Sequence, residues 1–567
     1  MLTVSEVLTQ HYPQLQNRPL LAKPLIFCLK KLCHETDIQG FVQQYPHLSG
    51  IDFVEQVLDY FEATYSYRDN EILSIPKTGK VIIVANHPLG SLDGLALLKL
   101  IHAVRPDIKV MANQLLTAIT HIESLLLPVN NTRSATSKHD LKKVHAHLQN
   151  EGAVLIFPAG EVSRLRPQGV RDTQWRSGFL KLAKQYHAPI LPMYIKAKNS
   201  PLFYSLSMLY KPLASALLIK EMFKQRATHF PVRIGQIIPP QAYDMPDVSM
   251  KHICKLFKKH VYALGHDKSL VFKTQAPIAL PEDKVRLKHA ILDECESLGH
   301  TDDGKAIYLY RHSGSSVIMR EIGRLREIAF RAVGEGTWTK RDIDRYDQSY
   351  LHLVLWDPNA LEIVGAYRFG CAKDVLDVHG SDLYSQSLFQ YNQTSAPMFA
   401  KGLELGRSFV QPKYWGKRSL DYLWFGIGAY LNRYPDYQYL FGPVSLSNTY
   451  SEPAKQMIVA FYQRYFGTSS PCAIANVPYR IQPDMLDVFD GEDYQADLVR
   501  LKHMLKAMGY AIPTLFKQYT ELTEASGTAF HAFGVDPDFS HCVDGLIVVD
   551  LHKLKQKKYN RYIAKHP

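Results

Sequence analysis

The sequence predicts two different α/β domains, and three features of its pattern lead to that prediction. From Lys80 onward, short apolar and β-branched runs alternate with stretches of helical periodicity, which is typical of layered α/β domains. Prolines accumulate between residues 239 and 283 while sustained strands disappear, which indicates a boundary. No internal repeat relates the two halves. We therefore expect a helical segment at residues 1–65, one domain at 66–245, a linker at 246–294 and a second domain at 295–567.

Composition excludes several classes of protein before any motif is considered. An apolar content of 46% over 567 residues is ample for large buried cores. The seven cysteines form no CxxC pair, so we expect neither a disulfide framework nor a metal site, and a cytoplasmic location. The net charge of +12 predicts an anionic partner. Because the basic residues are spread along the chain without a recognition module, we expect a membrane surface or an acidic carrier protein and no nucleic acid.

The first domain is predicted as a sheet covered on both faces. Its candidate strands are continuous apolar runs, which are typical of strands buried on both sides. Stretches of helical periodicity separate these runs. The strands are residues 81–85, 109–112, 153–157 and 190–195, and the helices are residues 95–102, 138–149 and 178–187.

The chain lacks the features of a membrane-spanning protein. We see no secretory signal at its start and no apolar run of the roughly 20 residues that a bilayer requires. Residues 202–223 are rich in Leu, Tyr and Phe but are interrupted by Lys211, Pro212 and Lys220. They form either interfacial helices or an amphipathic helix packed on the domain. We expect peripheral association with an anionic membrane surface, at the inner face of the cell membrane.

A histidine and an aspartate follow the first strand, within the turn at residues 86–93. Acyl transfer from a thioester to a hydroxyl needs a general base, and His87 is the candidate. Asp93 would bond the other ring nitrogen, fix its tautomer and stabilise the imidazolium. Asp93 also precedes an apolar helix, so its alternative role is that of an ordinary N-cap.

Three further segments follow this turn in order, at residues 127–133, 157–164 and 189–195. Together the four resemble the blocks of the lysophosphatidic-acid acyltransferase-like family over residues 65–240. The resemblance implies that His87 and Asp93 are catalytic. It also implies that four later residues bind substrate, namely Arg133, Glu161, Ser163 and Arg164.

The sequence departs from the common pattern of that family at two points. Five residues separate His87 from Asp93 where four are usual, and Gly90 is placed to absorb the extra residue through a left-handed backbone. Glu161 is displaced by two positions from the usual Phe-Pro-Glu-Gly loop. The displacement suggests an acceptor with a polar group other than glycerol phosphate.

The second domain shows an order of elements unlike the first. A helix around residues 319–331 precedes a strap at 334–347, a hairpin with strands at 352–356 and 362–369, a strand near 403–410 and a helix at 419–431. This order resembles the mixed α+β GNAT fold of N-acyltransferases over residues 295–510, in particular the branch with ornithine N-acyltransferases and acyl-homoserine-lactone synthases. The resemblance implies transfer of an acyl group to an amine.

Candidate residues for N-acylation lie on the strand near residues 403–410 and on the strap. Glu404 is the candidate to bind or deprotonate the amine. Arg407 would bind a carboxylate if a bulge at Gly406 brings it to the same face, because strand alternation otherwise separates the two. The alternative is that both form structural ion pairs. The other candidate substrate-binding residues are Asp344, Arg345 and Asn448.

The acyl donor and the joint reaction follow from both resemblances. Residues 411–418 lack an obvious glycine-rich pyrophosphate loop, and Lys413, Lys417 and Arg418 suit an acidic partner. We expect acyl carrier protein with its phosphopantetheine as donor, with coenzyme A thioester as the alternative, and no other cofactor. The two halves together resemble aminolipid synthases of the ornithine-lipid type. Their substrates would be an amino acid, expected to be ornithine, and the lyso-aminolipid made from it.

Two rival functions remain open at this point. In the first, the N-terminal domain is a phospholipid-remodelling acyltransferase of the 1-acyl-glycerophosphate type and the C-terminal domain is not catalytic. In the second, the chain is a haemolysin-like membrane-binding protein with degenerate blocks. Intact His87, Asp93 and Arg407 disfavour the second rival.

Overall fold

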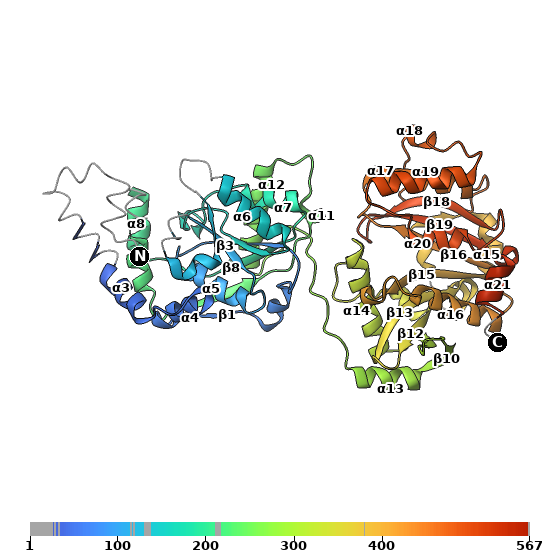
Figure 1. Cartoon of the computed structure of the whole chain (residues 1–567), viewed down its shortest axis with the longest axis horizontal. Coiled ribbons are helices and arrows are strands. Elements are labelled where there is room, and N and C mark those ends of the chain that lie inside the picture. The colour runs from blue at the N-terminus through green and yellow to red at the C-terminus, as the bar shows by residue number, and fades with distance from the viewer. Residues whose placement is uncertain are drawn as a thin grey trace. The chain divides into compact units, whose positions relative to one another are not determined.

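A computed structural model describes residues 26–27, 30–31, 34–113, 116, 119–129, 138–209, 217–378, 380 and 382–564. The chain divides into two compact units, Met1–Pro277 and Ile278–Pro567, coloured blue to green and green to red in Figure 1. The division falls within the predicted linker, yet both ends of that stretch are folded. α12 (Met250–Leu264) buries Ile253, Phe257 and Val261 in the first unit, and α13 (Lys284–Glu294) buries Leu287 and Ile291 in the second.

The first unit contains a seven-stranded sheet in the order β1-β9-β8-β2-β5-β3-β4. Neighbouring strands are parallel except β8 and β9. β6 and β7 form a separate hairpin. The strands are β1 (Thr64–Ser66), β2 (Val81–Ala85), β3 (Lys109–Asn113), β4 (Leu126–Val129), β5 (Ala153–Ile156), β6 (Arg164–Arg166), β7 (Gly169–Arg171), β8 (Ile190–Ile195) and β9 (His229–Ile234).

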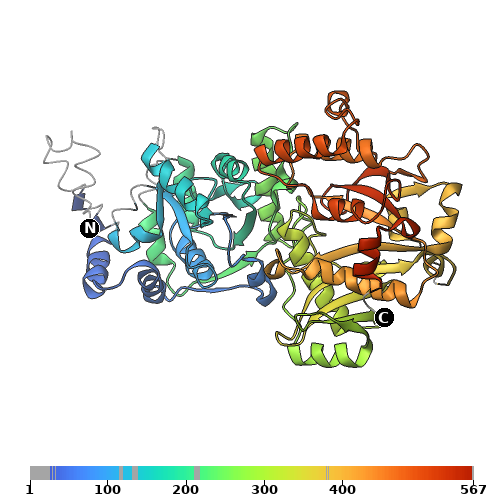
Figure 2. The same cartoon turned by 45° about the vertical axis from the view of Figure 1, so that its right-hand side comes forward.

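Helices cover both faces of this sheet, as the continuous apolar strands predict. Val81, Ile83 and Ala85 of β2 belong to one core, while Ile82 and Val84 belong to the other. The first core also contains α4 and α5, and the second α6, α7 and α12 (Figures 1 and 2). The remaining helices are α3 (Glu35–Gln44), α4 (Gly50–Tyr60), α5 (Leu92–His102), α6 (Lys138–Gln149), α7 (Gly178–Tyr186), α8 (Pro201–Leu209), α10 (Leu218–Lys224) and α11 (Pro240–Tyr243).

The segment with the ambiguous apolar pattern forms α8 and α10, and residues 210–216 between them lie outside the described part. Phe203 and Tyr204 are buried beside Val162, whereas Leu202 is 56% exposed. Most of the described apolar face of α8 therefore packs on the unit. Within the ranges that the structure describes, no helix is long and apolar enough to cross a membrane.

The second unit contains an eight-stranded sheet in the order β10-β11-β12-β13-β15-β16-β19-β18. All neighbours are antiparallel except β15 and β16. The predicted hairpin after Trp356 is confirmed. The strands of this sheet are β10 (Cys295–His300), β11 (Ala306–Arg311), β12 (Leu351–Asp357), β13 (Glu362–Cys371), β15 (Gly402–Val410), β16 (Tyr439–Leu446), β18 (Thr528–Asp536) and β19 (Cys542–Asp550). A separate two-stranded sheet is formed by β14 (Phe389–Tyr391) and β17 (Ala473–Ala475).

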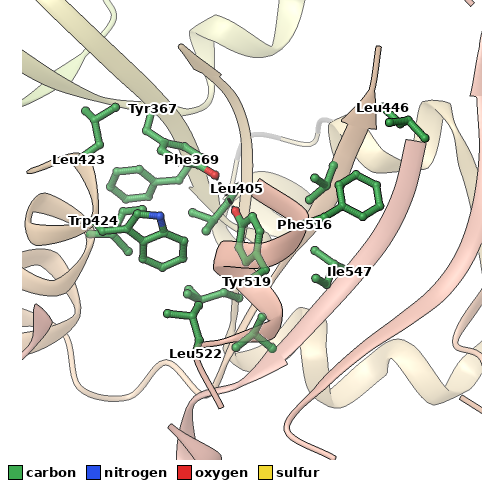
Figure 3. Close-up of a cluster of buried hydrophobic side chains, with 14 of the residues drawn as sticks. Tyr367, Phe369, Leu405, Leu423, Trp424, Leu446, Phe516, Tyr519, Leu522 and Ile547 are labelled. Atoms are coloured by element: carbon green, nitrogen blue, oxygen red, sulfur yellow. Dashed lines mark hydrogen bonds between the residues drawn. The ribbon is translucent and has the colours of Figure 1, made fainter. Parts of the chain in front are cut away.

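Two cores also enclose the second sheet. Leu353 and Leu355 pack with α16 and α17 on one face, while Val354 and Trp356 pack with α13 and α14 on the other. Figure 3 shows the first of these cores, in which the hydroxyls of Tyr367 and Tyr519 lie 2.5 Å apart. The helices not yet given are α14 (Val317–Ala332), α15 (Ala396–Lys401), α16 (Ser419–Arg433), α17 (Glu452–Phe466), α18 (Pro483–Leu486), α19 (Tyr494–Ala507), α20 (Thr514–Thr520) and α21 (Gln556–Tyr562).

Candidate active sites

The predicted histidine and aspartate meet at the carboxyl end of β2, a central strand. Nδ1 of His87 lies 3.0 Å from Oδ2 of Asp93. The buried Asp93 carboxylate also accepts hydrogen bonds of 2.9 Å from the backbone N–H groups of Leu89, Ser91 and Gly94. Gly90 absorbs the extra residue of the turn with a φ of +85°, as the sequence predicted. Asp93 therefore orders its own turn and orients His87.

The surroundings of His87 favour a positive charge on its ring. Burial opposes that charge, but the nearby Asp93 carboxylate outweighs burial and raises the pKa of His87 above its ordinary value. Burial likewise opposes the charge on Asp93, but His87 and the backbone donors hold the pKa of Asp93 below its ordinary value. Phe157 stacks on the imidazole at 4.1 Å between ring centroids. Nε2 has no hydrogen-bond partner among the described residues, which leaves it able to take a proton from a hydroxyl.

A second buried carboxylate, Asp172, links the histidine turn to the loop after β5. It accepts hydrogen bonds from the hydroxyl of Ser163 at 2.5 Å, from Nε1 of Trp175 at 2.9 Å and from the backbone N–H of His87 at 3.3 Å. The N–H of Ser163 in turn donates to the carbonyl of His87 at 2.8 Å. Ser163, predicted to bind substrate, is fully enclosed and positions the loop instead. The link between Asp172 and the histidine turn has no local sequence signal, because His87 lies 85 residues away in the chain.

Glu161 and Arg164 form the charged part of the same loop. Nη2 of Arg164 lies 3.6 Å from Oε2 of Glu161, and the guanidinium packs over the ring of Phe203 at 5.6 Å. Nε and Nη1 of this buried arginine have no hydrogen-bond partner in the described part of the chain. Arg164 is therefore suited to an anionic group of the acceptor. The fourth predicted substrate ligand, Arg133, lies outside the described residues.

The second candidate site lies where β15 and β16 separate. These parallel strands are paired only at Gly402–Glu404 with Tyr439–Phe441. Further along, β15 stays paired with β13, and β16 stays paired with β19. A cavity lies in the gap between the two diverging strands, and its walls include Gly406 to Ser408 of β15 and Pro443 to Ser445 of β16. We call this gap the wedge between β15 and β16.

Arg407 enters this cavity at a bulge, the condition that the sequence set for its role. The pairing of β13 with β15 shifts between Ala366 and Arg368, and Arg407 has a φ of +48°. Its guanidinium lies 5.1 Å from the ring centre of Tyr384 and 4.6 Å from that of Phe539. Burial opposes its charge, but the carboxylate of Asp342, 3.5 Å away, outweighs burial and raises the pKa of Arg407. Arg407 therefore stays cationic at the cavity.

The two strap residues predicted to act together point in different directions. Asp344 accepts a hydrogen bond of 2.5 Å from Nη1 of Arg368, and its Oδ2 lies 3.7 Å from Nη2 of Arg407. The side chain of Arg345 is 71% exposed, and its Nη2 lies 3.5 Å from Oδ2 of Asp382. Asp344 therefore supports the arginines of the cavity, and Arg345 faces away from them.

Glu404 and Asn448 also have structural partners. The buried Glu404 carboxylate accepts hydrogen bonds from the hydroxyl of Tyr350 and from the backbone N–H groups of Tyr384 and Ser385. Glu404 does not line the cavity. The side chain of Asn448 donates to the carbonyl of Ser540 and accepts from Lys455. Glu404 therefore has a structural role, as in the alternative that the sequence left open, although its partners are a hydroxyl and backbone N–H groups and not a cation.

Glu335 lines the cavity, although the sequence singled out no role for it. It lies between Gly334 and Gly336, directly after α14. The two flanking glycines were the available signal, because a glycine with a positive φ commonly ends a helix and turns the chain.

Comparison with known proteins places a different family in each unit. Residues 6–268 match the family described as Acyltransferase, and residues 325–425 match the Acetyltransferase (GNAT) domain. These matches confirm the predicted order of the two domains.

Three relatives match parts of the chain. A glycine N(alpha)-acyltransferase of Phocaeicola vulgatus is 32% identical over 306 residues, covering 50% of this chain and 92% of the relative. A lyso-glycine lipid O-acyltransferase of Bacteroides thetaiotaomicron is 31% identical over 231 residues, covering 40% of this chain and 84% of the relative. An L-ornithine N(alpha)-acyltransferase of Brucella abortus is 29% identical over 157 residues, covering 22% and 54%.

Proposed function

Because the chain belongs to the acyltransferases of aminolipid synthesis, and joins an acyltransferase domain to a GNAT domain, we propose that it makes an aminolipid in two steps. The C-terminal unit transfers a 3-hydroxyacyl group to the α-amine of an amino acid. The N-terminal unit then acylates the 3-hydroxyl of that product. The hydrogen-bonded pair of His87 and Asp93, with the free Nε2 of the histidine, carries this proposal.

In the O-acylation step, Nε2 of His87 removes the proton of the 3-hydroxyl as that oxygen attacks the thioester carbon. The bond between carbon and sulfur breaks, and the proton passes to the departing thiolate, which leaves as a thiol. Asp93 stabilises the imidazolium during the transfer. Arg164, with two unbonded guanidinium nitrogens, binds the carboxylate of the lyso-aminolipid.

The sequence leaves ornithine, glycine, lysine and glutamine open as the acceptor amino acid, and the names of relatives favour the first two. Ornithine is the acceptor expected from the sequence, and it stands in the name of one relative. Glycine stands in the name of a relative that is matched over more of its length. Equal concentrations of both amino acids, offered to the purified chain in one reaction, decide between them through the mass of the product.

We propose acyl carrier protein as the donor and an anionic membrane as the surface on which the product is handled. Lys413, Lys417 and Arg418 flank the exposed Trp415 in the sequence, which suits an acidic partner with an apolar contact. In the N-terminal unit, Leu165 is 44% exposed on β6, and the neighbouring α8 exposes Leu202. Exposed leucines beside basic residues favour the headgroup region of a bilayer.

The two steps are tested separately with purified protein. A synthetic N-(3-hydroxyacyl) amino acid and an acyl thioester are supplied, and the diacyl product is quantified by mass spectrometry. We expect O-acylation by the wild type and a loss of about 100-fold or more in His87→Ala, which removes the general base. N-acylation by the same His87→Ala preparation should be unchanged. Equal O-acylation by both proteins would contradict the assignment of His87.

A further inference from the structure

Glu335 places a carboxylate without a partner at the cavity between β15 and β16. No hydrogen bond or ion pair to its side chain is found within the described residues, although the residue is only partly exposed to water. Most carboxylates in such places are paired, since an unpaired buried charge raises the free energy of the folded state. An exception that lines a cavity is typical of a group that meets a ligand.

The backbone around Glu335 holds the side chain in one direction. The N–H of Glu335 donates to the carbonyl of Phe330 at 2.8 Å, and the N–H of Gly334 donates to the carbonyl of Arg331 at 3.1 Å. These two bonds, with a φ of +73° at Gly334, form a Schellman motif that ends α14. On the other side, the hydroxyl of Ser540 donates to the carbonyl of Gly336 at 3.0 Å. The carboxylate is therefore presented by a fixed turn.

The charges around this cavity favour a cation. Arg407 is already balanced by Asp342 and Asp344. Glu335 and the buried Asp544, whose carboxyl group accepts a 2.6 Å hydrogen bond from Ser445, bring two further carboxyl groups without a cation, so a bound cation would stabilise their charged forms. An amino-acid acceptor brings such a cation in its ammonium group. The carboxylate of the same amino acid can bind Arg407.

Electrostatics also suit Glu335 to proton transfer near neutral pH. Burial and then the neighbouring Asp544 raise the pKa of Glu335 to about 8, and Arg407 opposes this rise. Burial raises the pKa of Asp544 to about 7. The other titratable groups whose charge interacts with Glu335 are Cys542 of β19 and Tyr450.

We propose that Glu335 binds the ammonium group of the amino-acid acceptor and accepts the proton that must leave before the nitrogen can attack. This assignment rests on the proposed N-acylation. One proton moves from the ammonium to the Glu335 carboxylate, which frees the nitrogen lone pair. The nitrogen bonds to the thioester carbon, the bond between carbon and sulfur breaks, and the second proton passes to the thiolate. Release of the first proton to water resets Glu335.

The test uses the full chain with a 3-hydroxyacyl thioester of acyl carrier protein and either glycine or ornithine. The variants are Glu335→Gln, which keeps the shape but cannot take the proton, and Glu335→Asp, which keeps the carboxylate. Glu492→Gln, which changes an exposed glutamate of the same unit, is the control. The rate of N-acylation is measured from about pH 6 to about pH 9, around the expected pKa of such a base.

We expect Glu335→Gln to lose about 100-fold or more in N-acylation, and its rate to follow the hydroxide concentration without the inflection of the wild type. Glu335→Asp should keep part of the activity, and Glu492→Gln should match the wild type. O-acylation of a supplied lyso-aminolipid by Glu335→Gln should be unchanged, and its thermal unfolding should match that of the wild type, which shows that both units of the variant are folded.

The outcomes separate this assignment from the proposed function. If the wild type N-acylates the amino acid and Glu335→Gln does so at the same rate and with the same pH profile, Glu335 is not the base and the proposed function stands. If the wild type forms no N-acyl amino acid from either acceptor, the proposed N-acylation fails, and the assignment of Glu335 fails with it.

Discussion

The hydroxyl of Ser163 donates a 2.5 Å hydrogen bond to the buried carboxylate of Asp172. The same carboxylate accepts from the backbone N–H of His87, so one side chain fixes both the turn that bears His87 and the loop that bears Glu161 and Arg164. The relative position of His87, the proposed base, and Arg164, the proposed ligand of the acceptor, therefore depends on a residue with no proposed chemical role.

Asp172→Ala should weaken both the fold and the reaction of the N-terminal unit. It leaves buried donors of Ser163 and Trp175 unpaired, and each such group costs about 1–3 kcal/mol. We expect a lower free energy of unfolding for this unit in urea and slower O-acylation. Ser163→Ala removes only one of these donors and should have the smaller effect on both quantities. Equal effects of the two variants would contradict the central position of Asp172.

The pH dependence of O-acylation should report on the pair of His87 and Asp93. A general base acts in its neutral form, and Asp93 raises the pKa of His87, so the rate should rise with pH through a midpoint above the ordinary value for histidine. In Asp93→Asn the favourable charge is gone while burial remains, so the midpoint should move to lower pH. The rate at high pH should also fall, by about 10⁴-fold if Asp93 acts as the aspartate of a serine-protease triad does. An unchanged midpoint in the pH profile of this variant would contradict the proposal that Asp93 raises the pKa of a catalytic His87.

Gly90→Ala should disturb the turn that holds His87. A Cβ there would lie 2.3 Å from Cγ1 of Val162, on a backbone with a φ of +85°. The matched control is Gly169→Ala at the tip of the β6–β7 hairpin, where φ is +97° but no atom lies within 4 Å of the added Cβ. Both variants carry backbone strain of about 1–3 kcal/mol, and only the first adds a clash. We expect the melting temperature to fall further in Gly90→Ala than in Gly169→Ala. O-acylation by Gly90→Ala should also be slower.

Arg407 and Arg345 should differ sharply in N-acylation, although both were predicted to bind the amino acid. Arg407 lines the cavity, whereas Arg345 faces solvent. Arg407→Lys keeps the charge but loses the planar guanidinium that spans the rings of Tyr384 and Phe539 and can bind a carboxylate in two places. We expect the KM for the amino acid to rise by at least about tenfold. This corresponds to the binding free energy that one hydrogen bond to a charged group contributes. Arg345→Ala should leave the KM unchanged, and a comparable rise in that variant would overturn the assignment to Arg407.

Local sequence determined the parts of the sites that could be predicted. His87 and Asp93 lie in one turn, so their spacing and Gly90 were enough to place them together. The bulge beside Gly406 follows from strand alternation and the conformational freedom of glycine. The continuous apolar runs predicted the central strands, because a strand covered by helices on both faces has no side that must be polar.

Long-range contacts determined the rest. Asp172 meets the His87 turn from 85 residues away, and no pattern near either residue signals that contact. Glu404 had the right chemistry, but the segment with Tyr384 and Ser385 covers its face of β15 and satisfies its oxygens. Glu335 gains its place only when α14 ends beside the wedge between β15 and β16, which neither element shows alone.

Lipid extracts of cells that express the chain show whether one protein carries out both acylation steps. Mass spectrometry of cells with the wild type should show a new phosphorus-free lipid with two acyl groups on an amino acid. Cells with His87→Ala should lack that lipid and accumulate its form with a single acyl group. If the diacyl lipid persists unchanged in His87→Ala, or if neither lipid forms with the wild type, the account of two coupled acylations is wrong.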